Sequence, residues 1–408
     1  MAQVCCSPLL SPEQQHFAFS LMAVVEPASY GEALIDPRLQ AAMREEIQAL
    51  YDNQTWVITD LLGGMKAIGC KWVFRVKYHP DGSVERFKVR LVANGYNQVY
   101  GIDYCDTFSP VAKLTSVKML LAIASIQNWH LHHMDVNNAY LNDDLDEVVY
   151  MELPPRLKEK TELRGKVCRL KKFLYGLKHA SRMWYAKLTK TLLAHGFKQS
   201  NDDCSIFLST VENSLVVIIV YVEDIVIGSI CLKAVEAVKR MLKFVFKMKD
   251  LGDLKYFLGL EINKVNGGIH VSQRKYCIEL LREAGFEECK PAKTPSGVKQ
   301  VLSAQDGEPF HDISKFKHLL GQLQYLNTTR PDITYAVQQL YQYQDSPTTV
   351  HFKALQRVFR YLKNAPGQGL FYPSNSSIQI TDYSDLDWAT CPNSRRSITE
   401  KQETRHCI

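Results

Sequence analysis

The sequence of 408 residues lacks several features that would assign it to a common class of protein. It contains no uninterrupted apolar run of the roughly 18 residues that a membrane-spanning helix needs. No basic segment followed by an apolar one stands at its start, so no secretory signal is indicated. Its 11 cysteines include no CxxC spacing, and only Cys5 and Cys6 are adjacent, which favours reduced thiols over disulfides. We therefore expect a soluble, intracellular protein that does not associate with a membrane.

The composition is that of an ordinary globular chain, with 46% hydrophobic and 23% charged residues. The length predicts roughly two or three domains with substantial cores. A net charge of +6 permits a polyanionic partner but does not by itself indicate one. His130, His132 and His133 have no matching cysteine or histidine pair nearby, so we expect them at the surface or in a groove rather than around zinc.

An acidic pair lies inside one of the most apolar stretches of the chain. The segment Leu215 to Gly228 reads LVVIIVYVEDIVIG, which predicts two short buried strands joined by a tight turn with Glu223-Asp224 at its tip. Two neighbouring carboxylates repel one another, and a divalent cation with oxygen ligands, such as magnesium, offsets their charge. An exposed acidic turn on a core hairpin is the alternative, and for an isolated pair it is the commoner case.

Hydrophobic periodicity and turn residues predict the order of the other elements. The segment up to about Pro37 lacks periodicity and is expected to be a tether, and the Pro-, Gly- and Ser-rich stretch 290–309 marks a boundary. Helices are expected at 40–53, 116–127, most of 170–197, 235–249, 276–284, 314–327 and 347–363. Strands are expected at 71–77, 86–93 and 130–135, with a further hairpin that turns at 266–268.

The first two of these strands form a basic hairpin through the turn Pro80-Asp81-Gly82. A solvated charged face is an equally good explanation for such a run of cations. The basic residues that the hairpin brings together are Arg75, Lys77, Arg86, Lys88 and Arg90.

A second carboxylate strand has to approach the acidic pair if two metal ions are to bind there. Asp135, at the end of the strand HLHHMDV, is the candidate. Tyr140 follows five residues later and could exclude the 2′-hydroxyl that distinguishes ribose from deoxyribose. Basic hairpin, aspartate strand and acidic hairpin, in that order, are the parts that a template-directed polymerase needs.

Long motifs then show a family resemblance that covers residues 30–399. The run CKWVFRVKYHPDGSVERFKVRLVANGYNQVYGIDYCDTFSPVAKLTSVKMLLAIA closely resembles the fingers of copia-type LTR-retrotransposon reverse transcriptases. MDVNNAYLNDDLDEVVYMELPP and LKKFLYGLKHASRMWY resemble the first catalytic motif and the template-and-nucleotide motif of that family. YVEDIVIG stands where the family has YVDD, and DLGDLKYFLGLEI resembles the primer-gripping segment. LLGQLQYLNTTRPDITYAVQQL, RYLKNAPGQGLFY and YSDLDWATCPNSRRS resemble the connection and the start of an RNase H domain.

The resemblance implies an α+β, right-hand polymerase fold of fingers, palm and thumb, with an antiparallel palm sheet. A connection and an incomplete RNase H-like segment would follow the hand. The implied divisions are an N-terminal tether at 1–37, fingers at 38–115, palm with elements of the fingers at 116–235, primer grip and thumb at 236–300, connection at 301–370 and a truncated RNase H-like start at 371–408.

The same resemblance implies roles for individual residues. Asp135, Glu223 and Asp224 would be catalytic and bind Mg²⁺, with Mn²⁺ as an alternative. The residues implied to contact the incoming dNTP are Lys88, Arg90, Val136, Tyr140, Gly176 and Lys178. Lys239, Lys243 and Lys247, on a helix that would begin the thumb, would follow the backbone of an RNA template paired with a DNA primer. Asp385 would be the remnant of an RNase H site.

Departures from the family pattern predict an RNA-directed DNA polymerase with impaired activity. Glu223 replaces an aspartate and places its carboxylate on a longer arm, His179 and Ser181 replace Gln and Pro, and Asn94 replaces a lysine. The RNase H pattern ends after Thr399, so RNase H activity is not expected, nor are integrase or protease activities. If expressed, the protein would reside in the cytoplasm or a virus-like particle. The alternatives are a catalytically dead relic that still binds nucleic acid and a relic that is not expressed.

Overall fold

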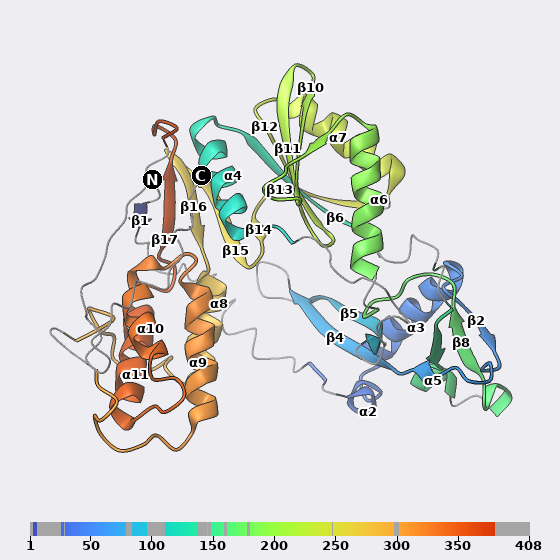
Figure 1. The fold of residues 1–408 in the computed structure, drawn as a ribbon, viewed down its shortest axis with the longest axis horizontal. Helices are drawn as coiled ribbons and strands as arrows, with labels where there is room; N and C mark the ends of the chain where they lie inside the picture. The colour runs from blue at the N-terminus through green and yellow to red at the C-terminus, as the bar shows by residue number, and fades with distance from the viewer. Residues whose placement is uncertain are drawn as a thin grey trace.

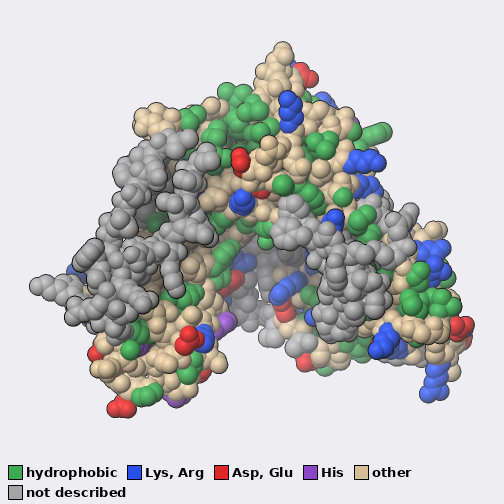
Figure 2. All heavy atoms as spheres, in the orientation of Figure 1, with side chains coloured by type: hydrophobic (Ala, Val, Ile, Leu, Met, Phe, Trp, Pro, Cys, Tyr) green, Lys and Arg blue, Asp and Glu red, His purple; other side chains and the backbone are tan. Residues whose placement is uncertain are grey.

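The computed structural model describes residues 3–5, 26–27, 29–78, 84–95, 111–136, 145, 148–158, 161–177, 180–246, 248–297 and 302–379. Within these ranges the chain forms three bodies (Figure 1), and the space-filling view shows a hollow between them (Figure 2). On the face shown in Figure 2, Lys, Arg, Asp and Glu side chains border part of this hollow. None of the helices within the described ranges is long and apolar enough to cross a membrane.

The first body is an antiparallel sheet of six strands, which we call the central sheet. Its strand order is β13-β6-β12-β11-β10-β9, so β6 lies between the two strands that follow it much later in the chain. The strands are β6 (His130–Val136), β9 (Lys198–Gln199), β10 (Ile206–Val211), β11 (Ser214–Tyr221), β12 (Asp224–Ser229) and β13 (Met248–Asp253).

Both faces of the central sheet are covered by helices (Figure 1). Val216, Ile218 and Val220 of β11 pack in one cluster with α6 (Ala180–Ala194) and α7 (Leu232–Val245). The intervening Val217 and Ile219 pack in a second cluster with α4 (Leu114–Ile126). Because each face meets apolar side chains, β11 is a continuous hydrophobic run instead of an alternating one.

The second body joins the long hairpin of β4 (Cys70–Tyr78) and β5 (Val84–Ala93) to a small sheet through one hydrophobic cluster. Arg75 lies opposite Lys88 and Lys77 opposite Arg86, so the expected basic hairpin is formed. The small sheet contains β2 (Trp56–Thr59), β8 (Val167–Leu170), β7 (Tyr150–Glu152) and β3 (Ala67–Ile68). The helices of this body are α2 (Tyr30–Ala33), α3 (Pro37–Asp52) and α5 (Pro155–Lys158), with the 3-10 turn η3 (Thr161–Leu163).

The third body combines a bundle of helices that share one core with a five-stranded sheet, whose buried side chains pack in the second cluster of the central sheet, together with α4. The helices on the two sides of the stretch 290–309 belong to the core of the bundle. The sheet has the strand order β1 (Gln3–Cys5), β17 (Gly369–Pro373), β16 (Gly268–Ser272), β15 (Leu260–Val265) and β14 (Tyr256–Phe257). The helices are α8 (Arg274–Glu283), α9 (Ile313–Leu326), α10 (Thr334–Tyr341) and α11 (Thr349–Asn364), with the 3-10 turn η4 (Pro331–Ile333) between α9 and α10.

Most of the elements predicted from periodicity are confirmed, and the two misassigned stretches follow mainly from tertiary contacts. The stretch expected as helix from Leu170 is extended and turned up to residue 177, because the N–H groups of Lys171 and Lys172 donate to the carbonyl of Thr55 and Gly176 has a φ of 91°. The helix expected at 235–249 ends at Val245, since Met248–Asp253 pairs with β6 as a strand. The elements that were not predicted are the strands β1, β2, β3, β7, β8, β9, β10 and β17 and the helices α2, α5 and α10.

A buried arginine ties the helices of the third body together. Arg330 is 1% exposed, its guanidinium donates two hydrogen bonds of 3.0 and 2.8 Å to the two oxygens of Asp332, and its Nη1 donates to the carbonyl of Ala365 at 2.9 Å. The hydroxyl of Tyr361 donates to the same aspartate at 2.7 Å. A buried ion pair of this kind is costly to break, because the remaining charge loses its partner.

We expect Arg330→Ala to lower the free energy of unfolding by about 3–5 kcal/mol, because it leaves Asp332 with an uncompensated charge. Arg282→Ala is the matched control: its ion pair with Glu287 lies nearer the surface and should contribute less than about 1 kcal/mol. Urea denaturation followed by circular dichroism measures both, and equal losses would show that Arg330 is not a structural anchor.

Candidate active site

The turn between β11 and β12 carries the acidic pair at the end of two buried strands. Tyr221 pairs with Asp224, so the turn consists of Val222 and Glu223, and Asp224 is the first residue of β12. The turn is therefore one residue earlier than the expected Glu223-Asp224 tip. Val222 has a φ of 55°, a conformation that is uncommon for a β-branched residue. The buried indole of Trp184 on α6 donates to the carbonyl of Val222 at 2.8 Å and holds the turn in place.

Three carboxylates meet at this turn. Asp224 lies directly opposite Asp135 in the register of β12 and β6, and directly paired residues of antiparallel strands project from the same face of a sheet. The N–H of Val136 donates to the carbonyl of Glu223 at 3.0 Å, which fixes the turn beside the end of β6. The fold therefore brings Asp135 beside the acidic turn, and the predicted metal-binding role of the three carboxylates stays a prediction.

The pKa of Asp135 reflects the negative charge of the site. Burial raises this pKa above its ordinary value, and the negative charges of Glu223 and Asp224 raise it further. Lys88 on β5 and His133 on β6 act in the opposite direction without cancelling the effect. Excess negative charge in a half-buried place is the condition that a bound cation relieves.

The side chain of Glu223 is joined to the second body by an ion pair. Arg90 on β5 donates to its two carboxylate oxygens at 3.2 and 3.4 Å. The hydroxyl of Tyr175 donates to one of the same oxygens at 3.0 Å, and the guanidinium of Arg90 lies 4.0 Å from the centre of the Tyr175 ring. Burial acts to lower the pKa of Arg90, but the influence of Tyr175 and Glu223 outweighs it and the pKa is raised.

The other carboxylate of the turn has a histidine partner. Nε2 of His133 lies 2.8 Å from Oδ1 of Asp224. His133 is two residues before Asp135 on the same strand, so both side chains lie on one face of β6. Asp224 and Glu223 are thus each engaged by a different neighbour.

The carboxylate oxygens match the ligands that magnesium prefers. In the part of the chain that the structure describes, no group of three or more His, Cys, Asp or Glu side chains lies close enough to hold a metal ion. Glu223 is directed to Arg90 and Asp224 to His133. The donor chemistry therefore fits a divalent cation, whereas binding through all three carboxylates requires Glu223 to leave Arg90.

Gly176 brings the LYGLK segment against the basic hairpin. A Cβ at this position would lie 2.1 Å from the carbonyl oxygen of Ala93, and the φ of 91° also favours glycine. The carbonyl of Tyr175 accepts a hydrogen bond from the N–H of Ala93 at 2.7 Å. Gly176 thus positions Tyr175 beneath Arg90.

Several predicted site residues lie outside the described ranges, so the structure does not place them relative to the carboxylates. These residues are Tyr140, Lys178, His179, Lys247 and Asp385.

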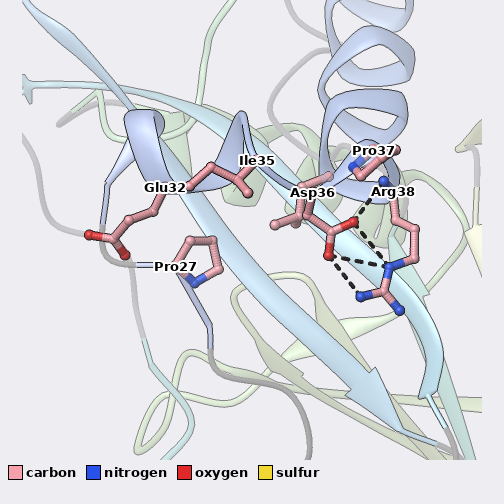
Figure 3. Close-up of a pocket in the computed structure, with 7 residues that line it drawn as sticks. Pro27, Glu32, Ile35, Asp36, Pro37 and Arg38 are labelled. Carbon is pink, nitrogen blue, oxygen red and sulfur yellow. Dashed lines mark hydrogen bonds and ion pairs between the residues drawn. The ribbon is translucent and has the colours of Figure 1, made fainter.

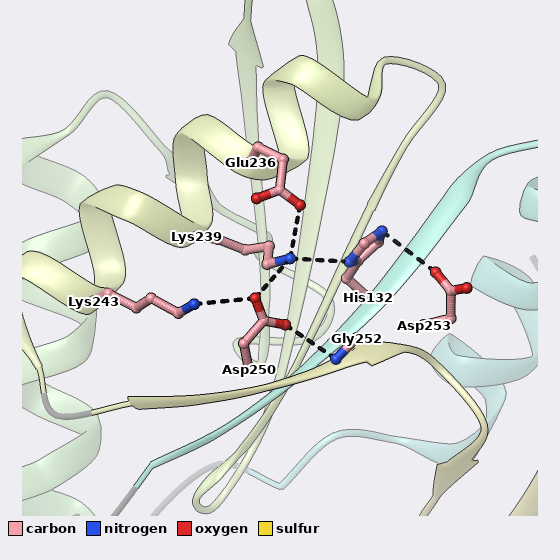
Figure 4. Close-up of polar contacts among 7 residues, drawn as sticks. All are labelled: His132, Glu236, Lys239, Lys243, Asp250, Gly252 and Asp253. Carbon is pink, nitrogen blue, oxygen red and sulfur yellow. Dashed lines mark hydrogen bonds and ion pairs between the residues drawn. The ribbon is translucent and has the colours of Figure 1, made fainter.

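Lys239 lies away from solvent, at the centre of a polar cluster shown in Figure 4. It is 5% exposed, and its ammonium lies 2.7 Å from Glu236, 2.8 Å from Asp250 and 3.2 Å from Nδ1 of His132. Its neighbour His132, expected at the surface or in a groove, is buried as well. Because these partners occupy the ammonium, the predicted contact of Lys239 with a nucleic-acid backbone does not match its position.

The Lys239 cluster fastens β13 and α7 to β6. Lys243 on α7 lies 3.1 Å from Asp250, and Asp253 lies 3.5 Å from Nε2 of His132. This attachment holds Lys249, which periodicity assigned to a helix, opposite Asp135 in the sheet register. Lys249 therefore lies beside the acidic site, on the side away from Asp224.

A pocket of about 690 Å³ lies at the start of α3, outside this site (Figure 3). Asp36 caps α3 there and forms hydrogen bonds with Nε and Nη2 of Arg38 at 3.1 and 2.8 Å. Asp36 and Arg38 pair with each other, and Glu32 is the third charged residue that lines the pocket.

Sequence reasoning did not single out Tyr175, His133 or Trp184 as parts of the site. Tyr175 belongs to the quoted LYGLK motif, and the spacing of two residues between His133 and Asp135 places them on one strand face. Both Tyr175 and His133 could therefore have been identified from the sequence. The contact of Trp184 with Val222 spans 38 residues and has no local pattern.

Comparison with known proteins gives consistent matches. Residues 53–297 match the family model described as "Reverse transcriptase (RNA-dependent DNA polymerase)". The retrovirus-related Pol polyprotein from transposon RE2 of Arabidopsis thaliana is 40% identical over 380 residues, 93% of this chain and 26% of that protein. The corresponding polyprotein from transposon TNT 1-94 of Nicotiana tabacum is 34% identical, over 92% of this chain and 29% of that protein. The chain thus spans about a quarter of the length of these polyproteins.

Shorter relatives and solved structures also match. A putative transposon Ty5-1 protein of Saccharomyces cerevisiae is 32% identical over 254 residues, 62% of this chain and 82% of that protein. Among solved structures, a foamy viral protease-reverse transcriptase in complex with dsDNA is 14% identical, with a TM-score of 0.47, and the match covers 81% of this chain and 58% of that one.

We expect the contribution of Asp250 to the free energy of unfolding to depend on pH. Burial acts to raise the pKa of Asp250, but hydrogen bonds from Lys239, Gly252 and Lys243 lower it to about 2. The contribution is therefore complete above the ordinary value of 3.8 and is lost as the pH falls toward about 2. Asp250→Asn should destabilise the protein at pH 6 and by roughly half as much at pH 3.

The measurement is the free energy of unfolding at the two pH values. Asp345→Asn is the control, because it removes an exposed carboxylate that pairs with Lys317 at the surface. A loss from Asp250→Asn that is the same at both pH values would contradict the assigned role of the Lys239 cluster.

Proposed function

The chain belongs to the reverse transcriptase (RNA-dependent DNA polymerase) family, in its copia-type retrotransposon branch, and we propose that it extends a DNA primer on an RNA template with dNTPs. The observation that carries the proposal is the register pair of Asp135 and Asp224 beside Glu223, with Arg90 reaching the same turn from the basic hairpin. Carboxylates for metal ions and cations for a triphosphate are the two halves of a nucleotidyl-transfer site.

Asp135, Asp224 and Glu223 are the residues that would hold divalent cations, Mg²⁺ in the first place and Mn²⁺ as an alternative. Such ions would activate the primer 3′-hydroxyl and stabilise the leaving group. The raised pKa of Asp135 supports this assignment, because it reflects carboxylates gathered without enough positive charge. The backbone of Val136 would border the same place.

The nucleotide would be held by cations and by the residues around them. Lys88 and Arg90 complement the charge of a triphosphate, and Gly176 sets the LYGLK segment beside them. Tyr140 and Lys178 are assigned to the nucleotide by family resemblance, with Tyr140 discriminating against ribose.

The RNA template and DNA primer would be bound mainly through phosphate contacts, which are salt-sensitive and independent of sequence. Lys243, with a side chain 42% exposed, and Lys247 remain the proposed contacts on and after α7. Lys239 is excluded from this set by its burial. The cytoplasm or a virus-like particle is the proposed place of action.

The primary test is primer extension on an RNA template by the purified protein. We expect Asp135→Asn to abolish extension, because a neutral amide cannot replace a carboxylate beside a dication, while duplex affinity stays within about twofold. Asp253→Asn is the control, since this carboxylate lies on β13 of the same sheet and its side chain is 80% exposed. Extension that survives Asp135→Asn would refute the proposed active site.

A second candidate function is nucleic-acid binding without catalysis. It is favoured by the ion pair of Glu223 with Arg90, which keeps one proposed metal ligand on another partner. Binding of a primer–template duplex that falls with salt concentration, together with no extension in either metal, would identify this function.

We expect Glu223→Asp to raise primer extension at least tenfold, or about 1.4 kcal/mol of barrier, because it shortens the arm of the metal ligand without changing its charge. Adding Asp135→Asn should remove the gain. Extension that stays at background in Glu223→Asp would place the defect elsewhere, with His179 and Ser181 as the next residues to test. Equal rates in the wild type and the Asp variant would show that Glu223 is not limiting.

A further inference from the structure

The contact between Arg90 and Glu223 links two bodies of the molecule at one point of the proposed active site. Arg90 comes from β5 of the basic hairpin and Glu223 from the β11–β12 turn, 133 residues later. Their side chains are only 25% and 22% exposed. An ion pair with this degree of burial is screened less than a surface pair.

The geometry of the contact is that of an arginine holding an oxyanion. Nη1 and Nη2 of Arg90 each donate to a different oxygen of Glu223. Arginine recognises phosphate through the same planar, two-pronged arrangement. A triphosphate that engages Arg90 through these donors therefore has to displace the carboxylate of Glu223.

Tyr175 supports the guanidinium from the other side. Its ring face lies 4.0 Å from the guanidinium carbon, and its hydroxyl donates to Glu223 at 3.0 Å. Tyr175 is 8% exposed, and its backbone carbonyl is tied to β5 through Ala93. The tyrosine thus contacts both members of the ion pair and has little freedom to move away.

We propose that Glu223 competes internally with the nucleotide triphosphate for Arg90, and that Tyr175 is the positioning residue that holds Arg90 for either partner. The inference rests on the proposed polymerase function, because it takes Arg90 to be a phosphate ligand. In the protein without metal, the phosphate site is closed by the protein's own carboxylate. A cation that draws Glu223 toward Asp135 and Asp224 releases Arg90 for the triphosphate.

The length of the side chain at position 223 is central to this competition. Aspartate has one methylene fewer, which withdraws the carboxylate by roughly 1 Å, and the present contacts of 3.2 and 3.4 Å leave little reserve. An aspartate would therefore leave Arg90 without this partner. The reach of glutamate couples metal binding to triphosphate binding, and such coupling is reciprocal between the two ligands.

The test measures binding of inorganic triphosphate to the full chain in the presence of a chelator, so that no divalent cation and no catalysis are involved. We expect Glu223→Gln and Glu223→Asp to bind triphosphate about fivefold more tightly than the wild type, the effect of releasing one partly exposed ion pair. Arg90→Gln should bind more weakly than the wild type. In the Arg90→Gln background, Glu223→Gln should give less than a twofold change.

Asp224→Asn is the matched charge control, because it removes one negative charge from the same turn but its carboxylate is paired with His133 instead of Arg90. A gain in Asp224→Asn equal to that in Glu223→Gln would show a general loss of negative charge and overturn the proposal. A gain that persists without Arg90 would overturn it as well.

Two further readouts separate positioning from general damage. Hydrogen exchange at the backbone amides of β5 should become faster in Glu223→Gln, because the hairpin loses its tie to the turn, and unchanged exchange would contradict the link.

Tyr175→Phe keeps the ring and removes the hydroxyl, so triphosphate binding should stay within twofold, whereas Tyr175→Ala should weaken it. Equal binding by these two variants would remove the positioning role of the ring. Absence of primer extension in every variant would refute the polymerase proposal and leave these binding results interpretable.

Discussion

Burial of the central sheet on both faces is the constraint on which the candidate site depends. The strands β6, β11 and β12 bury apolar side chains against α4 on one face and against α6 and α7 on the other. Carboxylates are therefore confined to the places where these strands end, and strand pairing brings Asp135 and Asp224 to the same place. The hydrophobic packing stabilises a cluster of like charges that would disperse on a flexible segment.

The ion pair of Arg90 with Glu223 joins this charge cluster to the second body of the molecule. It connects the basic hairpin to the β11–β12 turn, and Tyr175 makes the connection stiff. From the sequence, Glu223 was interpreted only as a metal ligand on too long an arm. Here the same length lets it reach a cation on another body, so one methylene decides whether the turn contacts the hairpin.

The sequence was sufficient to predict the strands of the site and its carboxylates, because continuous apolar runs and turn residues are local signals. Leu215 to Gly228 was read correctly as a hairpin, although its turn begins at Val222. The burial of Lys239 was not predictable, since its partners His132 and Asp250 lie on two other elements. A lysine on an amphipathic helix looks solvated until the opposing strands are known. The end of α7 was misplaced for the same reason, because pairing of Met248 with Val136 is a tertiary contact.

The apolar run of β11 also bears on how the chain reaches its fold. Ser214–Tyr221 contains no charged residue and no proline, a composition that favours intermolecular strand pairing when it is exposed. Synthesis from the N-terminus completes α4, β6 and α6 before this strand, and α7 follows directly after β12. The elements that cover β11 are thus either synthesised before it or follow soon after it. This order shortens the time during which the exposed strand can aggregate.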